Sequence, residues 1–160
     1  MAVEIERKFL VTGTDYRSGV RSFFRQGYLS DTPGRTVRVR VVDQKAFLTV
    51  KGLSKGASRA EYEYEIPLDD AREMLDNLCP DSVIEKYRYV LPAGNGLQWE
   101  VDEFLGANLG LVVAEIELRH ENDSFQLPGW IGSEVTGDRR YYNSYLSTHP
   151  FRSWDTLSPK

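Results

Sequence analysis

The chain has 160 residues, of which 41% are hydrophobic and 28% charged, and its net charge is −4. This composition is typical of a soluble globular protein with one core, excludes a disordered chain, and gives no reason to expect nucleic-acid binding. Cys79 is the only cysteine, so an internal disulfide and a cysteine-rich zinc site are both excluded.

Eight segments are predicted as β-strands because polar and apolar residues alternate along them. They span residues 3–11, 23–30, 35–43, 46–52, 60–67, 83–91, 97–104 and 111–119. Apolar residues at helical spacing predict a helix over residues 69–78. Weaker signals indicate helices over 15–22 and 136–147, the last with Thr136 or Asp138 as its N-cap. Since no linker or repeat interrupts the chain, we expect one domain over residues 1–160.

Eight mostly antiparallel strands can close into a barrel, which removes exposed sheet edges. The predicted fold class is therefore mainly β (α+β), an eight-stranded antiparallel barrel with a few helices. A barrel of this size is either filled by its own side chains or holds one small ligand. The direction in which the charged strand faces point decides between these two cases.

Charged residues repeat on one face of several predicted strands, and neighbours on a face often share a sign. Four same-sign pairs stand out: Glu4 with Glu6, Arg38 with Arg40, Lys86 with Arg88, and Glu115 with Glu117. The simpler interpretation is a solvated outer face, with the charges exposed to water. Like charges repel unless an opposite charge lies between them, so the pattern as a whole favours a metal ion against the acids and a polyanion against the bases.

The opposite strand faces carry aromatic residues, which we expect to pack outside the barrel under helices. They are Tyr62, Tyr64, Tyr87, Tyr89 and Trp99.

Carboxylates without histidine or cysteine suit Mg²⁺ or Mn²⁺ better than zinc. Residues two apart on a strand are separated by about 6.6 Å, so both carboxylates of a Glu-x-Glu can reach one ion or a neighbouring pair. Mg²⁺ commonly binds one or two carboxylates together with substrate phosphates, and rows of Lys and Arg would hold the remaining phosphate oxygens. No Walker-type glycine loop offers another phosphate site. The pattern predicts a polar tunnel for a metal-bound polyphosphate.

The segment EIERK at residues 4–8 resembles the Glu-x-Glu-x-Lys signature of the CYTH superfamily, the triphosphate tunnel metalloenzymes. Further short segments extend the resemblance over nearly the whole chain, and their order and spacing together are specific. They are RQGYL at 25–29, RVR at 38–40, TVKG at 49–52, EYE at 61–63, EKYR at 85–88, WEVDEF at 99–104, AEIEL at 114–118 and VTGDRRYYNSYL at 135–146. The resemblance implies a single CYTH domain over residues 1–160, with a charged antiparallel β-tunnel and helices packed outside it.

The resemblance also implies residue roles. The implied ligands of two Mg²⁺ or Mn²⁺ ions are Glu4, Glu6, Glu61, Glu63, Asp102, Glu115 and Glu117. The implied catalytic and substrate-binding bases, which hold phosphate oxygens, are Lys8, Arg38, Arg40, Lys51, Lys86 and Arg88.

Hydrolysis of inorganic tripolyphosphate is the favoured function, with nucleoside triphosphates as further candidate substrates, because the chain is compact and shows no segment for base recognition. An adenylyl cyclase that makes cyclic AMP from ATP would use the same groups, so the tunnel residues do not separate the two. A thiamine triphosphatase ranks lower, since residues 1–98 hold no tryptophan to stack on the thiazolium. Outside the family, the alternatives are a polyphosphate-binding module without turnover and an apolar carrier of the lipocalin kind.

The expected partner is a small-molecule triphosphate, with neither nucleic acid nor membrane, and the expected assembly is a monomer or a homodimer. The N-terminus is acidic within six residues and has no long apolar run, so we expect no signal peptide and no membrane span. The expected location is the cytoplasm.

Overall fold

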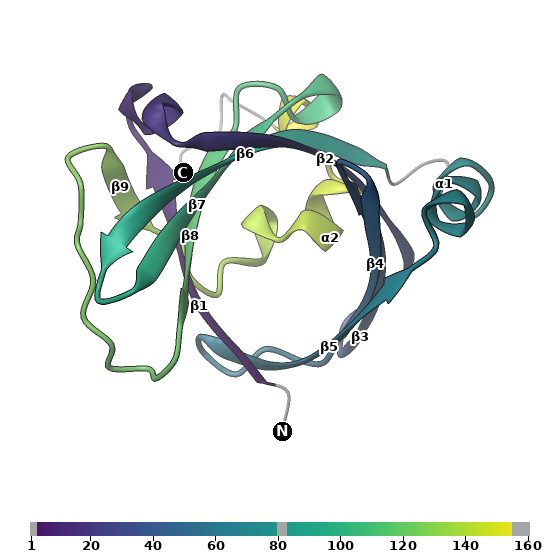
Figure 1. Ribbon diagram of the computed structural model, residues 1–160, viewed down its shortest axis with the longest axis horizontal. Helices are drawn as coiled ribbons and strands as arrows, with labels where there is room; N and C mark the ends of the chain where they lie inside the picture. Colours follow the sequence, from purple (N-terminus) through teal and green to yellow (C-terminus); the bar gives the residue numbers. More distant parts are fainter. Residues whose placement is uncertain (1–2, 80–82, 155–160) are drawn as a thin grey trace.

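The computed structural model describes residues 3–79 and 83–154, and within them a β-sheet closes on itself (Figure 1). The strand order is β5-β4-β3-β2-β6-β7-β8-β1-β9, and β5 also pairs with β1. Strands β1 to β8 therefore form a closed barrel, with β9 attached outside the ring to β1. The strands are β1 (Val3–Val11), β2 (Val20–Thr32), β3 (Arg35–Val42), β4 (Lys45–Lys51), β5 (Ser58–Ile66), β6 (Ile84–Gly94), β7 (Leu97–Phe104), β8 (Val112–Leu118) and β9 (Ile131–Glu134).

All strand pairs are antiparallel, so the predicted eight-stranded antiparallel barrel is confirmed. The prediction missed β9, because a strand of four residues is too short to show alternation.

The helical segments match the sequence in part. Helix α1 (Leu68–Asn77) lies where a helix was predicted. In place of a helix over 15–22, the chain forms one 3₁₀ turn, η1 (Asp15–Ser18), and then enters β2. The predicted helix over 136–147 is divided into η3 (Arg139–Tyr141) and α2 (Asn143–Leu146), because Tyr142 between them has an extended backbone. The remaining 3₁₀ turns are η2 (Gly106–Asn108) and η4 (Phe151–Ser153).

The predicted N-cap at Asp138 is present at the start of η3. Asp138, one of the two predicted caps, accepts a hydrogen bond from the backbone N–H of Arg140. None of the helices in the described residues is long and apolar enough to cross a membrane.

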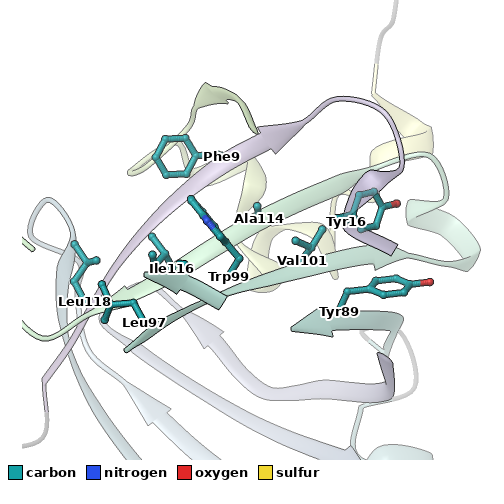
Figure 2. Close-up of a cluster of buried hydrophobic side chains, with 10 residues drawn as sticks. Phe9, Tyr16, Tyr89, Leu97, Trp99, Val101, Ala114, Ile116 and Leu118 are labelled. Atoms are coloured by element: carbon teal, nitrogen blue, oxygen red, sulfur yellow. The ribbon is translucent and has the colours of Figure 1, made fainter. Parts of the chain in front are cut away.

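The largest apolar cluster lies on the outer side of β1, β6, β7 and β8 (Figure 2). At its centre, Trp99 is fully buried and packs edge-on against Phe9, Phe125 and Trp130, with ring centroids 5.5–5.9 Å apart. Its indole N–H donates to the backbone oxygen of Gln126 at 2.9 Å, so the one polar atom of the side chain is satisfied. Segments η1, β9 and 119–130 supply the residues that cover this cluster.

A second outer cluster forms where α1 packs on β3 and β4, through Ala71 and Leu75 of the helix and Val39 and Ala46 of the strands.

The expected burial of the aromatic residues is confirmed for Trp99 and Tyr89 and is wrong for two others. Tyr62 and Tyr64 on β5 are 44% and 61% exposed. The cluster beneath helix α1 includes Ile66 at the end of β5 but neither Tyr62 nor Tyr64.

Replacing Trp99 with alanine tests whether stability resides outside the barrel. We expect Trp99→Ala to lower the free energy of unfolding by about 3–5 kcal/mol, because it removes a fully buried aromatic ring. Tyr64→Ala, on an exposed stretch of the same barrel, is the control and should cost less than about 1 kcal/mol. Urea denaturation measures both values, and equal losses in the two variants would contradict the outer core.

Candidate active site

A polar cavity of about 50 Å³ lies inside the barrel. Its lining includes all six predicted phosphate-binding residues: Lys8, Arg38, Arg40, Lys51, Lys86 and Arg88. The predicted acids Glu6 and Glu115 line it as well. The charged strand faces therefore point inward, and the interpretation as a solvated outer face is wrong. An apolar carrier is excluded for the same reason, because its apolar faces would have to point inward.

The most deeply buried charges form a row of three side chains on β6 and β7. Asp102 is 1% exposed and accepts hydrogen bonds from Lys86 Nζ at 2.7 Å and from Arg88 Nε at 2.7 Å and Nη2 at 2.9 Å. Burial alone would raise the pKa of Asp102, but the charges of Arg88 and Lys86 hold it below the usual value. For Lys86 burial prevails over the attraction of Asp102, and its pKa falls to about 7.

Arg40 and Arg88 approach the same aromatic ring. Their guanidinium carbons lie 4.8 Å and 4.6 Å from the centroid of Phe24, within cation–π range. Burial, together with the like charges of Arg38 and Arg88, lowers the pKa of Arg40 to about 9. An anion that enters the cavity would relieve this repulsion.

Arg38 offers an unsatisfied donor. Its Nη2 donates to the Thr49 hydroxyl at 3.2 Å, whereas its Nε is a buried nitrogen with no hydrogen-bond partner among the described residues. Such a group is costly unless a ligand or water accepts from it. The donor therefore fits a phosphate oxygen in the cavity.

Three carboxylates from three different strands meet at one point of the barrel. Oxygen atoms of Glu4 (β1), Glu61 (β5) and Glu117 (β8) lie within 4.8 Å of one another. Lys51 Nζ lies 2.9 Å from Glu4 and 3.4 Å from Glu61, and partly neutralises the cluster. Burial and the charges of Glu4 and Glu61 raise the pKa of Glu117 to about 7. This set of oxygen ligands fits Mg²⁺ or Mn²⁺.

The remaining predicted acids lie near bases or beside the cluster. Lys8 Nζ is 3.4 Å from Glu115, and Arg38 Nη2 is 3.6 Å from Glu63. Burial, with the charges of Glu115 and Glu4, raises the pKa of Glu6 to about 8. A bound cation would therefore stabilise the ionised form of Glu6.

The cavity lining also contains residues that the strand patterns did not predict as site residues. They are Thr36, Arg59, Tyr142, Asn143 and Ser144. Tyr28, whose strand parity with Phe24 and Gln26 is compatible with either packing or a position in the tunnel, lines the cavity as well. Arg59 and Thr36 lie at strand ends, where alternation is weakest. Tyr142, Asn143 and Ser144 belong to the segment that enters the barrel after η3. The basic and polar composition of RRYYNSYL was the one available signal for that segment.

The sequence matches a known protein family over most of its length. The family model described as the CYTH domain matches residues 2–145. The chain belongs to the CYTH family.

Named relatives cover nearly its full length. An inorganic triphosphatase of Acetivibrio thermocellus is 54% identical over 155 residues, which are 96% of this chain and 99% of that protein. An inorganic triphosphatase of Nitrosomonas europaea is 37% identical over 148 residues, 90% of this chain and 96% of that protein. Among solved structures, that of the inorganic triphosphatase NE1496 superimposes with a TM-score of 0.65 at 34% identity, covering 89% of this chain and 96% of that one.

The acidic cluster predicts a pH-dependent gain of stability on Glu117→Gln in this CYTH protein. The folded pKa of Glu117, about 7, exceeds the unfolded value near 4.5, so its ionisation destabilises the fold as the pH rises through this range. In EDTA at pH 8, Glu117→Gln should raise the free energy of unfolding by up to about 1 kcal/mol, a small effect because water reaches the side chain.

The gain should vanish near pH 4, where both states are protonated. Denaturation at the two pH values measures it, with Glu65→Gln, an exposed acid outside the cluster, as the control. A loss of stability of Glu117→Gln at pH 8 would show that the carboxylate of Glu117 is not destabilised by those of Glu4 and Glu61.

Proposed function

We propose that this chain hydrolyses inorganic tripolyphosphate with the help of Mg²⁺ or Mn²⁺. The observation that carries the proposal is the charge distribution inside the closed barrel, where six bases line the cavity and one of them, Lys51, contacts a cluster of three carboxylates. The inorganic triphosphatase of A. thermocellus, 54% identical over nearly the whole of both chains, supports the same activity.

Glu4, Glu61 and Glu117 are the residues that would hold a divalent cation, and Glu6 and Glu115, which line the cavity, would complete its shell. Glu63 does not line the cavity and pairs with Arg38 at 3.6 Å. When bound, the cation neutralises phosphate charge and lowers the pKa of a coordinated water. Asp102 has a different part in this proposal from the one the family resemblance implied. Both of its oxygens accept from Lys86 and Arg88, so it orients these bases and does not bind metal.

The six bases bind the triphosphate and stabilise the charge that develops on it during hydrolysis. Arg38 keeps a buried Nε that has no partner among the described residues and can donate to a ligand, and Arg40 and Arg88 are held in place by the ring of Phe24. Preorganised donors of this kind need no reorganisation when charge develops, which is the main source of catalysis in phosphoryl transfer.

Substrate preference gives the direct test. With Mg²⁺ or Mn²⁺ present, we expect faster phosphate release from tripolyphosphate than from ATP or thiamine triphosphate, because the cavity lining consists mainly of charged and polar groups suited to phosphate oxygens. Chelation with EDTA should abolish release. Chromatography of the ATP reaction checks for cyclic AMP, and its appearance, or turnover of ATP equal to that of tripolyphosphate, would overturn the preference.

Substitutions of acids and of bases should have separable effects. Glu4→Ala should lower kcat by about 100-fold or more and weaken metal activation, since it removes a proposed ligand. Arg40→Ala should lower activity by about 100-fold through weaker phosphate binding and transition-state stabilisation, with metal affinity unchanged. Arg40→Lys should not restore it, because an ammonium cannot both stack on Phe24 and donate from Nε to Gln26.

Glu65→Ala and Arg25→Ala, which change the same charge types outside the cavity, are the matched controls and should retain activity. Kinetics titrated separately with metal and with substrate distinguish the two classes, and thermal melting verifies folding. Full activity of Glu4→Ala would contradict the proposed metal site.

A further inference from the structure

The segment of residues 141–146, from the end of η3 through α2, lies inside the barrel and also contacts the candidate site. Figure 1 shows α2 within the ring of strands, and Tyr142, Asn143 and Ser144 line the polar cavity. The backbone oxygen of Tyr141 accepts a hydrogen bond from Lys8 Nζ at 3.1 Å. The segment thus contacts the bases of the site directly.

Asn143 has the most specific contacts in this segment. Its Oδ1 accepts hydrogen bonds from Lys86 Nζ at 2.9 Å and from Gln26 Nε2 at 3.0 Å. Gln26, which is fully buried, in turn accepts from Arg40 Nε through its Oε1 at 2.7 Å. A single amide oxygen therefore links two of the proposed phosphate-binding bases, Lys86 directly and Arg40 through Gln26.

The orientation of both amides follows from the charged groups at the two ends of this chain of hydrogen bonds. A guanidinium and an ammonium can only donate, so Arg40 must face the oxygen of Gln26 and Lys86 must face the oxygen of Asn143. Gln26 then directs its NH₂ toward Asn143, in agreement with the same assignment. Because Oδ1 is held by two donors, the direction of the Asn143 Nδ2 group is fixed as well.

The free donors of this network belong to groups that line the cavity. An ammonium has three protons, and those of Lys86 that point to Asp102 and Asn143 leave one for another acceptor. Among the hydrogen bonds of residues 3–79 and 83–154, none has Asn143 Nδ2 as its donor. Donors at the wall of a basic cavity are suited to phosphate oxygens.

We propose that Asn143 is a further substrate-binding residue, whose Nδ2 donates to a phosphate oxygen of the triphosphate while its Oδ1 positions Lys86 and, through Gln26, Arg40. The inference rests on the proposed function in that a triphosphate is the ligand. It gives the C-terminal segment a direct part in substrate binding.

The experiment compares Asn143→Asp and Asn143→Ala. Asn143→Asp keeps an oxygen toward Lys86 and Gln26 and replaces the NH₂ donor, whereas Asn143→Ala removes both functions. Titration calorimetry with tripolyphosphate in EDTA measures binding without turnover, and we expect the dissociation constant to rise about tenfold or more in both variants. In assays with metal at saturating substrate, we expect kcat to fall about tenfold in Asn143→Ala and clearly less in Asn143→Asp.

Ser147→Ala, in the same segment but outside the cavity, is the control and should match the unmodified chain in binding and kcat. Thermal melting confirms that each variant is folded at the assay temperature. Dissociation constants within twofold of the unmodified value would overturn the donor role, and equal losses of kcat in the two Asn143 variants would overturn the positioning role. Because binding is measured in EDTA, the inference is decided even if tripolyphosphate binds without being hydrolysed, which would refute the proposed function alone.

Discussion

The placement of charge inside a closed barrel depends on one arrangement, the carboxylate of Asp102 held between Lys86 and Arg88. Removing an ion from water costs on the order of several kcal/mol, and an ion pair recovers this only with good geometry and further hydrogen bonds. Here each oxygen of Asp102 has a charged donor at 2.7 Å, and Lys86 has a second acceptor in Asn143. The buried bases keep fixed directions because these partners are satisfied, and those directions define the phosphate-binding surface.

The apolar packing of the barrel is divided between its two faces. Two clusters lie on the outer side of the strands, around Trp99 beneath η1, β9 and the 119–130 segment, and around Leu75 of α1. A third cluster, which includes Ile84, Phe104 and Val113, lies on the same strand faces as Lys86, Asp102 and Glu115 and packs against Leu146 of α2, so the charged site occupies only part of the interior. Alternation of side chains along a strand lets each strand contribute to both faces without any change of backbone.

A triphosphate that enters the barrel would have to displace some of the ion pairs inside it. The cavity volume of about 50 Å³ is small for such a ligand, and Lys51 and Lys8 lie beside Glu4 and Glu115. Binding of a cation by the acids and of phosphate by the bases exchanges these partners for others of the same charge. After this exchange each of these buried charges would still face a partner of opposite sign.

The sequence by itself determined the strands, their alternation and the same-sign charge pairs, which favoured a site for a metal ion and a polyanion. The six bases now found at the cavity were implied by the resemblance of their motifs to the CYTH superfamily. Alternation is a local property, so it can be read from Glu4, Glu6 and Lys8 alone. The sequence did not determine which acids meet: Glu4, Glu61 and Glu117 come together only because β1 pairs with both β5 and β8 when the barrel closes. Nor did it show that Asp102 is engaged by bases or that Asn143 contacts Lys86 across 57 positions of chain. Such contacts depend on strand register and on the entry of the C-terminal segment into the barrel, and only the tertiary structure decides these because they join residues far apart in the chain.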